Sequence, residues 1–234
     1  MALPKLNNAP KYEMVIPSTG KNVRYRPFLV KEEKNLMIAA ESGEQKLVFK
    51  ALVDTIANCL EDEVNTNKLT TFDIEYMFLQ LRSKSVGESS KISLPCDNCE
   101  ARSDIIVNLD EINIKIPEVS KEVQITDSIS IVLDYPPFSK ILETDLNNTS
   151  SDTAFALVRA CIVSINTEDE RIDVKDTPKE ELQEFIESMS SVQFEKIKDF
   201  IDKIPKLEHD IKYTCSSCNH NNEIHVEGVA NFLS

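Results

Sequence analysis

The fold is decided by two short stretches that share one plan: Ile92-Ser93-Leu94-Pro95-Cys96-Asp97-Asn98-Cys99 and Ile211-Lys212-Tyr213-Thr214-Cys215-Ser216-Ser217-Cys218. In each stretch a β-type run leads into C-x-x-C, and a second β-type run follows, which predicts a pair of cysteines at the tip of a β-hairpin. A tight turn of this kind lets both thiolates of a pair reach one tetrahedral metal ion. The sequence therefore predicts a structural zinc site with the ligands Cys96, Cys99, Cys215 and Cys218.

The spacing of these cysteines leaves alternatives open. The 115 residues between Cys99 and Cys215 exceed the usual spacing of a zinc ribbon, so the ribbon is predicted to be split by an insertion. The alternative is two pairs of reduced thiols that never meet. A redox role is disfavoured because a reactive C-x-x-C needs a helix N-terminus, whereas strands flank both motifs. His220 and His225 are near enough in sequence to replace a ligand, although four cysteines already complete the shell.

The composition is that of a folded protein whose partners are other proteins. The chain has 234 residues, with 26 Lys and Arg against 40 Asp and Glu, for a formal net charge of −14. This balance disfavours binding to nucleic acid and to anionic lipid, both of which attract cations. The N-terminus has no signal-peptide pattern, and no apolar run approaches the ~18 residues of a membrane span. We therefore expect no membrane partner and six reduced cysteines.

The segment before the first C-x-x-C predicts a hairpin followed by helices. Runs at 12–16 and 22–26 flank a turn-forming cluster and predict two paired strands. Apolar spacing predicts helices over 30–41 and 44–62, the first closed by Gly43. The core face of the second comprises Leu47, Val48, Ala51, Leu52, Thr55, Ile56, Cys59 and Leu60. A third helix, over 72–85 with Thr70 or Thr71 as its cap, is apolar around most of its circumference, and we expect it to be central, with Phe72, Tyr76 and Leu79 in the core.

The remaining chain alternates between strand-like and helix-like patterns. β-type runs occur at 91–94, 103–109, 112–116, 122–126 and 129–135. Helices are predicted from Phe138 onward, with Ala154, Val158, Cys161, Ile162 and Ile165 on one stripe, and near 191–203. Another helix is predicted to start at Thr177-Pro178-Lys179-Glu180, with Thr177 as the N-cap, the proline in the first turn and the glutamate completing a capping box. The last 27 or so residues return to strand, turn and strand.

These patterns predict an α+β protein with four parts. A helical N-terminal part after a β-hairpin covers residues 1–88, and the first C-x-x-C hairpin covers 89–118. An inserted β and helix-rich segment covers 119–206, and the second C-x-x-C hairpin with the C-terminal tail covers 207–234. The two hairpins together form the split, zinc-ribbon-like pair.

Motifs of known catalytic chemistry are missing from the sequence. The four glycines are isolated, so no phosphate-binding glycine loop is present, and neither H-E-x-x-H nor G-x-S-x-G occurs. Cys59 and Cys161 lie on apolar faces of predicted helices, where cysteine is usually a small core residue. A closed four-thiolate shell would also leave no position for a reactive water. We therefore expect no enzyme.

A second hypothesis is a zinc-ribbon protein that binds nucleic acid or takes part in transcription. Its motivation is the pair of C-x-x-C hairpins. The formal charge is −3 over residues 89–118 and −2 over 206–234, and acidic ribbons repel phosphate. The charge therefore favours protein partners.

Two further segments resemble a known family: Tyr25-Arg26-Pro27-Phe28-Leu29-Val30-Lys31-Glu32-Glu33-Lys34 and Phe72-Asp73-Ile74-Glu75-Tyr76-Met77-Phe78-Leu79-Gln80-Leu81-Arg82-Ser83-Lys84-Ser85-Val86-Gly87-Glu88. They are similar to the T4-type bacteriophage baseplate hub proteins, and Met1 to Leu6 fits the same pattern. The resemblance implies a non-enzymatic hub subunit or assembly factor whose partners are other hub proteins. It also implies action in the host cytoplasm during assembly, and presence in the virion if the protein stays. It carries over no catalytic residue and no metal ligand.

The C-terminal tail, Gly228 to Ser234, is short and apolar. It would expose Phe232 and Leu233 unless they dock on this chain or on another. Both arrangements are open from the sequence, and we expect the tail to contribute to partner binding.

Overall fold

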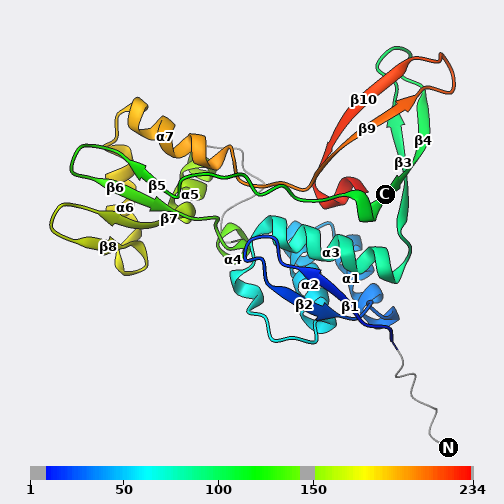
Figure 1. Ribbon diagram of the computed structural model, residues 1–234, viewed down its shortest axis with the longest axis horizontal. Coiled ribbons are helices and arrows are strands. Elements are labelled where there is room, and N and C mark those ends of the chain that lie inside the picture. Colours follow the sequence, from blue (N-terminus) through cyan, green and yellow to red (C-terminus); the bar gives the residue numbers. More distant parts are fainter. Residues whose placement is uncertain (1–8, 143–150, 233–234) are drawn as a thin grey trace, which may run out of the picture. The chain divides into compact units, whose positions relative to one another are not determined.

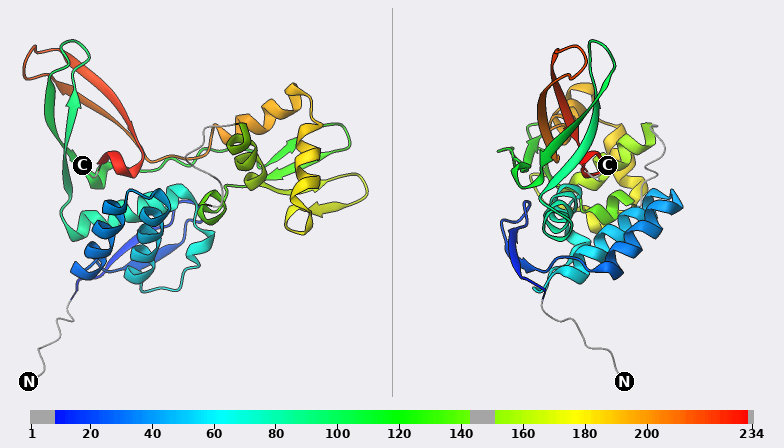
Figure 2. Two further views of the ribbon diagram at one scale, coloured as in Figure 1. Left: turned by 180° about the vertical axis from the view of Figure 1, so that it is seen from behind. Right: turned by 90° about the vertical axis from the view of Figure 1, so that its right-hand side faces the viewer.

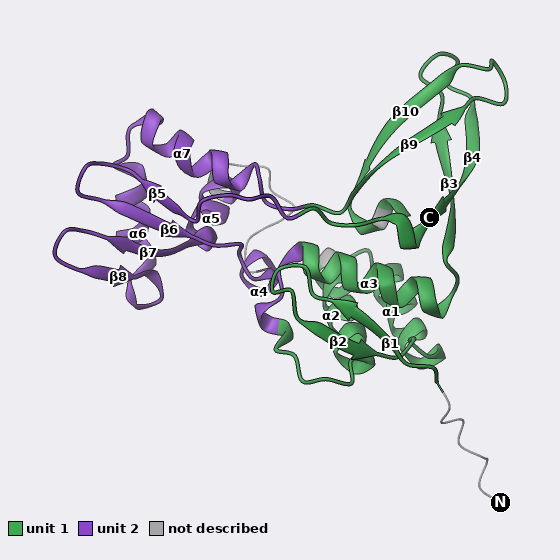
Figure 3. Ribbon diagram, viewed as in Figure 1, with its two compact units in different colours: residues 1–66, 72–115, 206–234 green, residues 67–71, 116–205 purple. Residues whose placement is uncertain are grey.

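The computed structural model describes residues 9–142 and 151–232 (Figure 1). Within them the chain forms seven α-helices and ten strands, which confirms the mixed α+β class. The chain divides into two compact units (Figure 3). Unit 1 comprises residues 1–66, 72–115 and 206–234, and unit 2 comprises 67–71 and 116–205. The predicted metal ligands all belong to unit 1.

Unit 1 begins with the predicted hairpin, in which β1 (Tyr12–Val15) pairs antiparallel with β2 (Asn22–Tyr25). The next two helices are α1 (Val30–Ser42) and α2 (Gln45–Cys59). Gly43 ends α1 with a φ of 69°, a left-handed conformation that glycine adopts without strain, and its N–H donates to the Ala40 carbonyl. Helix α2 ends at Cys59, three residues earlier than predicted, because Leu60 forms a β-bridge with Tyr25.

The third helix of unit 1, α3 (Thr71–Ser85), follows the 3-10 turn η1 (Thr66–Lys68) and is the most deeply buried helix of the unit. Phe72 and Leu79 are buried as predicted, whereas Tyr76 is only partly buried. In α2 the inner residues Leu52, Thr55, Ile56 and Cys59 are buried, but Leu47 is 44% exposed. Leu47 lies in the first turn of α2, beyond the reach of the core that covers the rest of the helix.

Two hairpins complete unit 1 and lie side by side in the views of Figures 1 and 2. The strands β3 (Ser89–Pro95) and β4 (Arg102–Asn108) form the first, and β9 (Glu208–Thr214) and β10 (Asn221–Glu227) form the second. A 3-10 turn follows each hairpin, η2 (Leu109–Glu111) and η4 (Val229–Phe232). The strand predicted at 112–116 does not form, because Ile112 caps η2 and is fully buried there.

Unit 2 contains a four-stranded antiparallel sheet in the order β5-β6-β7-β8. The strands are β5 (Glu122–Gln124), β6 (Ser130–Leu133), β7 (Ile162–Asn166) and β8 (Arg171–Asp173). The helices are α4 (Phe138–Leu142), α5 (Ser151–Cys161), α6 (Lys179–Glu187) and α7 (Ser191–Ile201), with the 3-10 turn η3 (Val174–Asp176) before α6. The sheet and the helices α5, α6 and α7 share one apolar core, which includes Ile131, Leu133, Val158, Ile162, Ile165, Leu182, Ile186, Ile197 and Phe200.

Two predictions for unit 2 were wrong in detail. The helical stripe was expected to continue through Ile165, but the helix ends at Cys161 and Ile162 begins β7. The run Ile162-Val163-Ser164-Ile165 is rich in β-branched side chains, which favour a strand. Thr177 does not cap α6; its hydroxyl donates to the Asp173 carbonyl, and Pro178 occupies the N-cap.

Candidate metal centre

The turns of the two hairpins bring the four predicted ligands together. The Sγ atoms of Cys96, Cys99, Cys215 and Cys218 all lie within 4.8 Å of one another. Cys96 and Cys218 are 3.7 Å apart, as are Cys99 and Cys215. A tetrahedral ion with Zn–S bonds of about 2.3 Å would place its sulfur ligands roughly 3.8 Å apart. The donor set and the spacing therefore fit a tetrahedral thiolate site, and the pairs of thiols do meet.

The two turns have the same backbone conformation. In the first, the Cys96 N–H donates to the Ala101 carbonyl (3.0 Å) and the Glu100 N–H to the Cys96 carbonyl (2.8 Å). In the second, the Cys215 N–H donates to the His220 carbonyl (2.8 Å) and the Asn219 N–H to the Cys215 carbonyl (3.0 Å). Glu100 and Asn219, each directly after the second cysteine, have φ values of 58° and 56°. A left-handed residue at this place closes the turn and points both thiols the same way.

The correspondence extends over both whole hairpins. Cys96 matches Cys215 and Cys99 matches Cys218, at a constant offset of 119 positions. The same offset superimposes β3 on β9 and β4 on β10, end to end. It also pairs buried Ile92 with buried Ile211. The cluster of four cysteines is therefore built from two copies of one structural plan, each of which supplies two thiols.

Backbone N–H groups in the turns favour the thiolate form of two cysteines. Hydrogen bonds from the Cys218 and Ser217 N–H groups lower the pKa of Cys215 to about 6. Burial opposes ionisation of Cys96, but the Asn98 and Cys99 N–H groups, together with the side chains of Asn222 and Cys218, lower the pKa of that thiol. Metal ions bind thiolates, so these hydrogen bonds prepare ligands for a cation.

The pKa of Cys99 is raised where four thiols lie close together. The Ala101 N–H favours its thiolate, yet the neighbouring Cys218 thiol, desolvation, and the thiols of Cys215 and Cys96 together raise the pKa of Cys99 to about 12. Like charges this close cannot all form unless a cation compensates them. A cation at the cluster would relieve this repulsion and favour the thiolate form of all four cysteines.

Two side chains that the sequence analysis did not select hold the turns together. Asn222 is buried; its Oδ1 accepts the Asp97 N–H of the other turn (3.0 Å), and its Nδ2 donates to the His220 carbonyl (3.1 Å). The Tyr213 hydroxyl donates to the Pro95 carbonyl. A polar residue at an inward-facing strand position is the signal that could have marked Asn222.

Among the described residues no histidine side chain belongs to the cluster, although the His220 carbonyl lies in the second turn, and the remaining cysteines lie elsewhere. His225 is on the outer face of β10, where its Nδ1 lies 2.7 Å from Asp210 Oδ1, and in the described part of the chain the cluster includes no histidine. Cys59 and Cys161 are fully buried, and burial raises the pKa of these thiols to about 11 and about 12. Both therefore behave as core residues, as predicted.

Both hairpins are anchored on α3. After the first, Asp110 in η2 accepts hydrogen bonds from Ser83 Oγ (2.6 Å) and Lys84 Nζ (2.7 Å). After the second, the Val229 N–H in η4 donates to Glu75 Oε1 (3.4 Å). Helix α3 is thus the common platform of the two halves of the cluster.

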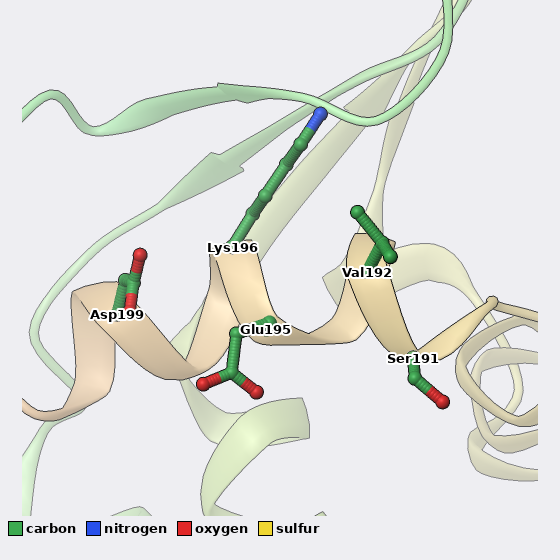
Figure 4. Close-up of a pocket in the computed structure, with 5 residues that line it drawn as sticks. All are labelled: Ser191, Val192, Glu195, Lys196 and Asp199. Atoms are coloured by element: carbon green, nitrogen blue, oxygen red, sulfur yellow. The ribbon is translucent and has the colours of Figure 1, made fainter.

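A shallow pocket on α7 offers no comparable chemistry (Figure 4). It is lined by residues of one helix, and Lys196 and Glu195 point away from each other. Lys196 Nζ donates to the Gln124 carbonyl at 2.7 Å. The titratable groups therefore do not converge as they would at an active site.

The family model of the T4 bacteriophage base plate protein matches residues 9–234, and the chain belongs to that family. It is also similar to the baseplate hub assembly protein gp26 of Enterobacteria phage T4. The two are 24% identical over 225 residues, which cover 95% of this chain and 98% of that protein. No solved structure matches. In the described residues, no helix has the length and apolar character needed to cross a bilayer.

Proposed function

We propose that this protein is a non-enzymatic subunit or assembly factor of a phage tail baseplate hub, and that it acts by binding other baseplate proteins. Membership of the T4 base plate family carries this proposal. The name of the phage T4 relative supports a place in the hub and a role in assembly. Such a protein would act in the host cytoplasm while tails are built, and would be found in the virion baseplate if it stays.

The proposal includes a structural zinc ion bound by Cys96, Cys99, Cys215 and Cys218. The single observation that supports it is the cluster of four Sγ atoms within 4.8 Å, with two of the separations at 3.7 Å. Four thiolates would close the coordination shell, so the ion would stabilise the fold and take no part in catalysis. The pair of hairpins would then be a zinc ribbon split by unit 2.

The distribution of charge supports protein partners over nucleic acid. Lysines on the hairpins are paired with acids: Lys91 with Asp104 (2.7 Å), Lys212 with Glu223 (3.0 Å) and Lys206 with Glu227 (2.9 Å). Lysines paired in this way present little free positive charge to a phosphate backbone.

The metal is tested by elemental analysis of protein purified without added metal. We expect about one zinc per chain in the wild type, and loss of that zinc together with a lower melting temperature in Cys218→Ser. Cys59→Ala is the matched control, because Cys59 is buried outside the cluster; it should keep its zinc. A metal-free wild type of normal stability would exclude the site.

The hub role is tested by complementation of a phage that lacks this protein. Wild-type protein supplied in trans should restore complete baseplates, counted by electron microscopy. A zinc-free variant such as Cys218→Ser should restore fewer. Normal baseplates in the uncomplemented phage would exclude the hub role and leave the zinc result unaffected.

A further inference from the structure

Helix α1 has an outer face that its own chain leaves uncovered. Val30, Lys34, Met37, Ile38 and Glu41 recur at the spacing i, i+4, i+7, i+8 and i+11, which places them on one side of a helix. Val30 is 79% exposed, Met37 59% and Ile38 55%. The opposite side carries the buried residues Glu32 and Ala39. Isolated exposed apolar residues are ordinary, but three on one helix face are typical of a binding surface.

The charges on this face are arranged symmetrically about its apolar centre. Lys34 lies three residues before Met37, and Glu41 lies three residues after Ile38. Lys31 already pairs with Glu32 at 3.3 Å, and Glu44 lies beyond the end of α1, so neither belongs to this arrangement. Within the part of the chain that the structure describes, the Lys34 and Glu41 side chains form no ion pair. Lys34 and Glu41 therefore lie on opposite sides of the apolar centre, and the exposed Glu33 adds one acid in the first turn of α1.

A second copy of the same face would complement this pattern. If two α1 helices pack antiparallel about a two-fold axis between Met37 and Ile38, the apolar residues of the two copies meet at the centre. Lys34 of each copy then faces Glu41 of the other. The exposed Val30 would lie near the α1–α2 connection of the partner, close to Leu47, which is 44% exposed. Self-complementarity of this kind is what an isologous dimer contact requires.

We propose that the outer face of α1 is a homodimer contact in which two copies of this chain pair antiparallel through Met37 and Ile38. The net charge of −14 does not oppose contact at this place, since residues 30–59 contain four lysines against five acids. One of these acids, Glu32, is buried and paired with Arg26 at 2.9 Å. The charge that would make two copies repel therefore lies mainly outside this face.

The area of the α1 face limits the affinity that we expect for the dimer. A 13-residue helix is about 20 Å long, so a single pair of such helices buries less than the ~1,200 Å² typical of stable specific interfaces. The dimer should accordingly be weak, and it should form in the micromolar range of protein concentration. High local concentration, as in a growing assembly, would favour it.

Sedimentation equilibrium of the full-length protein over about 1 to 300 μM tests the proposal. We expect a monomer–dimer equilibrium in the wild type and at least a tenfold weaker association in Met37→Glu. Lys34→Glu and Glu41→Lys should each weaken dimerisation, whereas the double variant should restore it, because the exchange re-forms both cross-pairs. The control is Ile106→Glu on the outer face of β4, where Ile106 is 74% exposed, and it should dimerise as the wild type does.

Each alternative outcome would overturn the proposal. If the protein is a monomer throughout the concentration range, the α1 face does not bind a second copy. A dimer unaffected by Met37→Glu, or one that the double charge exchange fails to restore, would place the contact elsewhere. The substituted residues are all exposed, and an unchanged thermal transition confirms that each variant is folded.

Discussion

Glu100 occupies a backbone conformation that suits glycine better than glutamate. Its φ of 58° lies in the left-handed region, where a Cβ atom costs roughly 1 kcal/mol, and no side-chain hydrogen bond of Glu100 is present among the described residues. Glu100→Gly should therefore raise the free energy of unfolding by about 0.5 to 1 kcal/mol. Urea denaturation of the metal-loaded protein measures the change.

Asn219 provides the matched control, since it has the same conformation in the other turn, with a φ of 56°. Asparagine tolerates left-handed backbone better than most residues. Asn219→Gly should consequently change stability less than Glu100→Gly does. If the two variants shift stability equally, or Glu100→Gly destabilises, backbone strain at Glu100 is not the reason.

His225 gives the hairpin surface a pH dependence. The hydrogen bond to Asp210 raises the pKa of His225 above its ordinary value, with help from the charges of Asp210, Glu208 and Glu227. Since the pKa is higher in the folded state, the imidazolium stabilises the fold below the ordinary histidine pKa. This contribution disappears as the pH rises through the raised pKa.

NMR titration of the imidazole tests this assignment. Asp210→Asn should return the pKa of His225 toward its ordinary value. Glu223→Gln, which alters an acid paired with Lys212 on the same face, should leave the His225 titration almost unchanged. An unaltered His225 titration in Asp210→Asn would contradict the assigned cause.

At the scale of elements, the two segments that resemble the family meet in the fold. Phe28 stacks on Phe78 with ring centroids 6.4 Å apart, and its N–H donates to Ser85 Oγ at 2.9 Å. Ser83 and Lys84 of the second segment bind Asp110 at the foot of the first C-x-x-C hairpin. These residues therefore join the helical part of unit 1 to the candidate metal centre.

The turn η4 packs into the core of its own chain, and the contribution of the tail to partner binding stays a prediction. Phe232 is fully buried and Val229 nearly so, so these residues dock on their own chain; Leu233 lies outside the described residues. Phe232→Ala should lower the free energy of unfolding by about 3 to 5 kcal/mol, whereas Val192→Ala, at a residue 73% exposed, should change it by less than about 0.5 kcal/mol. Chemical denaturation measures both. A Phe232→Ala variant that is stable but no longer co-purifies with hub proteins would show that Phe232 contacts a partner protein.

Local sequence patterns predicted some helices and strands correctly and failed to predict others. The first hairpin, helix α1 with its Gly43 end, and the strands around each C-x-x-C were predictable, because turn residues and alternation act over a few neighbours. The end of α5 was missed because Val158 and Cys161 continue without a break into Ile162 and Ile165. Only pairing with β6 decides that those residues form a strand.

At the scale of the whole molecule, local sequence patterns likewise predict only part of the candidate site. The identity of the four cysteines was readable from spacing, because a tight turn brings two thiols together whatever the rest of the chain does. The roles of Asn222 and Tyr213 could not be predicted from the sequence, because their partners Asp97 and Pro95 lie 125 and 118 positions away. Contacts at that distance depend on how the two hairpins come to lie side by side.

A metal ion at the cluster would close a loop between Cys99 and Cys215 that contains residues 116–205, the larger part of unit 2. In the chain-entropy model, a link across a loop of about 100 residues restricts the unfolded chain by roughly 4.7 kcal/mol. Unit 2 nevertheless has its own apolar core, and its sheet is hydrogen-bonded within 122–173. Loss of the metal should therefore loosen the two C-x-x-C hairpins and leave unit 2 folded.

Hydrogen exchange of the Cys215→Ser variant measures this separation. Amides of β3, β4, β9 and β10 should lose most of their protection relative to the wild type, because the cluster no longer fixes one hairpin against the other. Amides of β6 and β7, the central strands of the other sheet, should keep protection within about a factor of three, since their neighbours all belong to unit 2. An equal fall in both sets would show that the two units unfold as one cooperative body, with the ligand cluster controlling the stability of both.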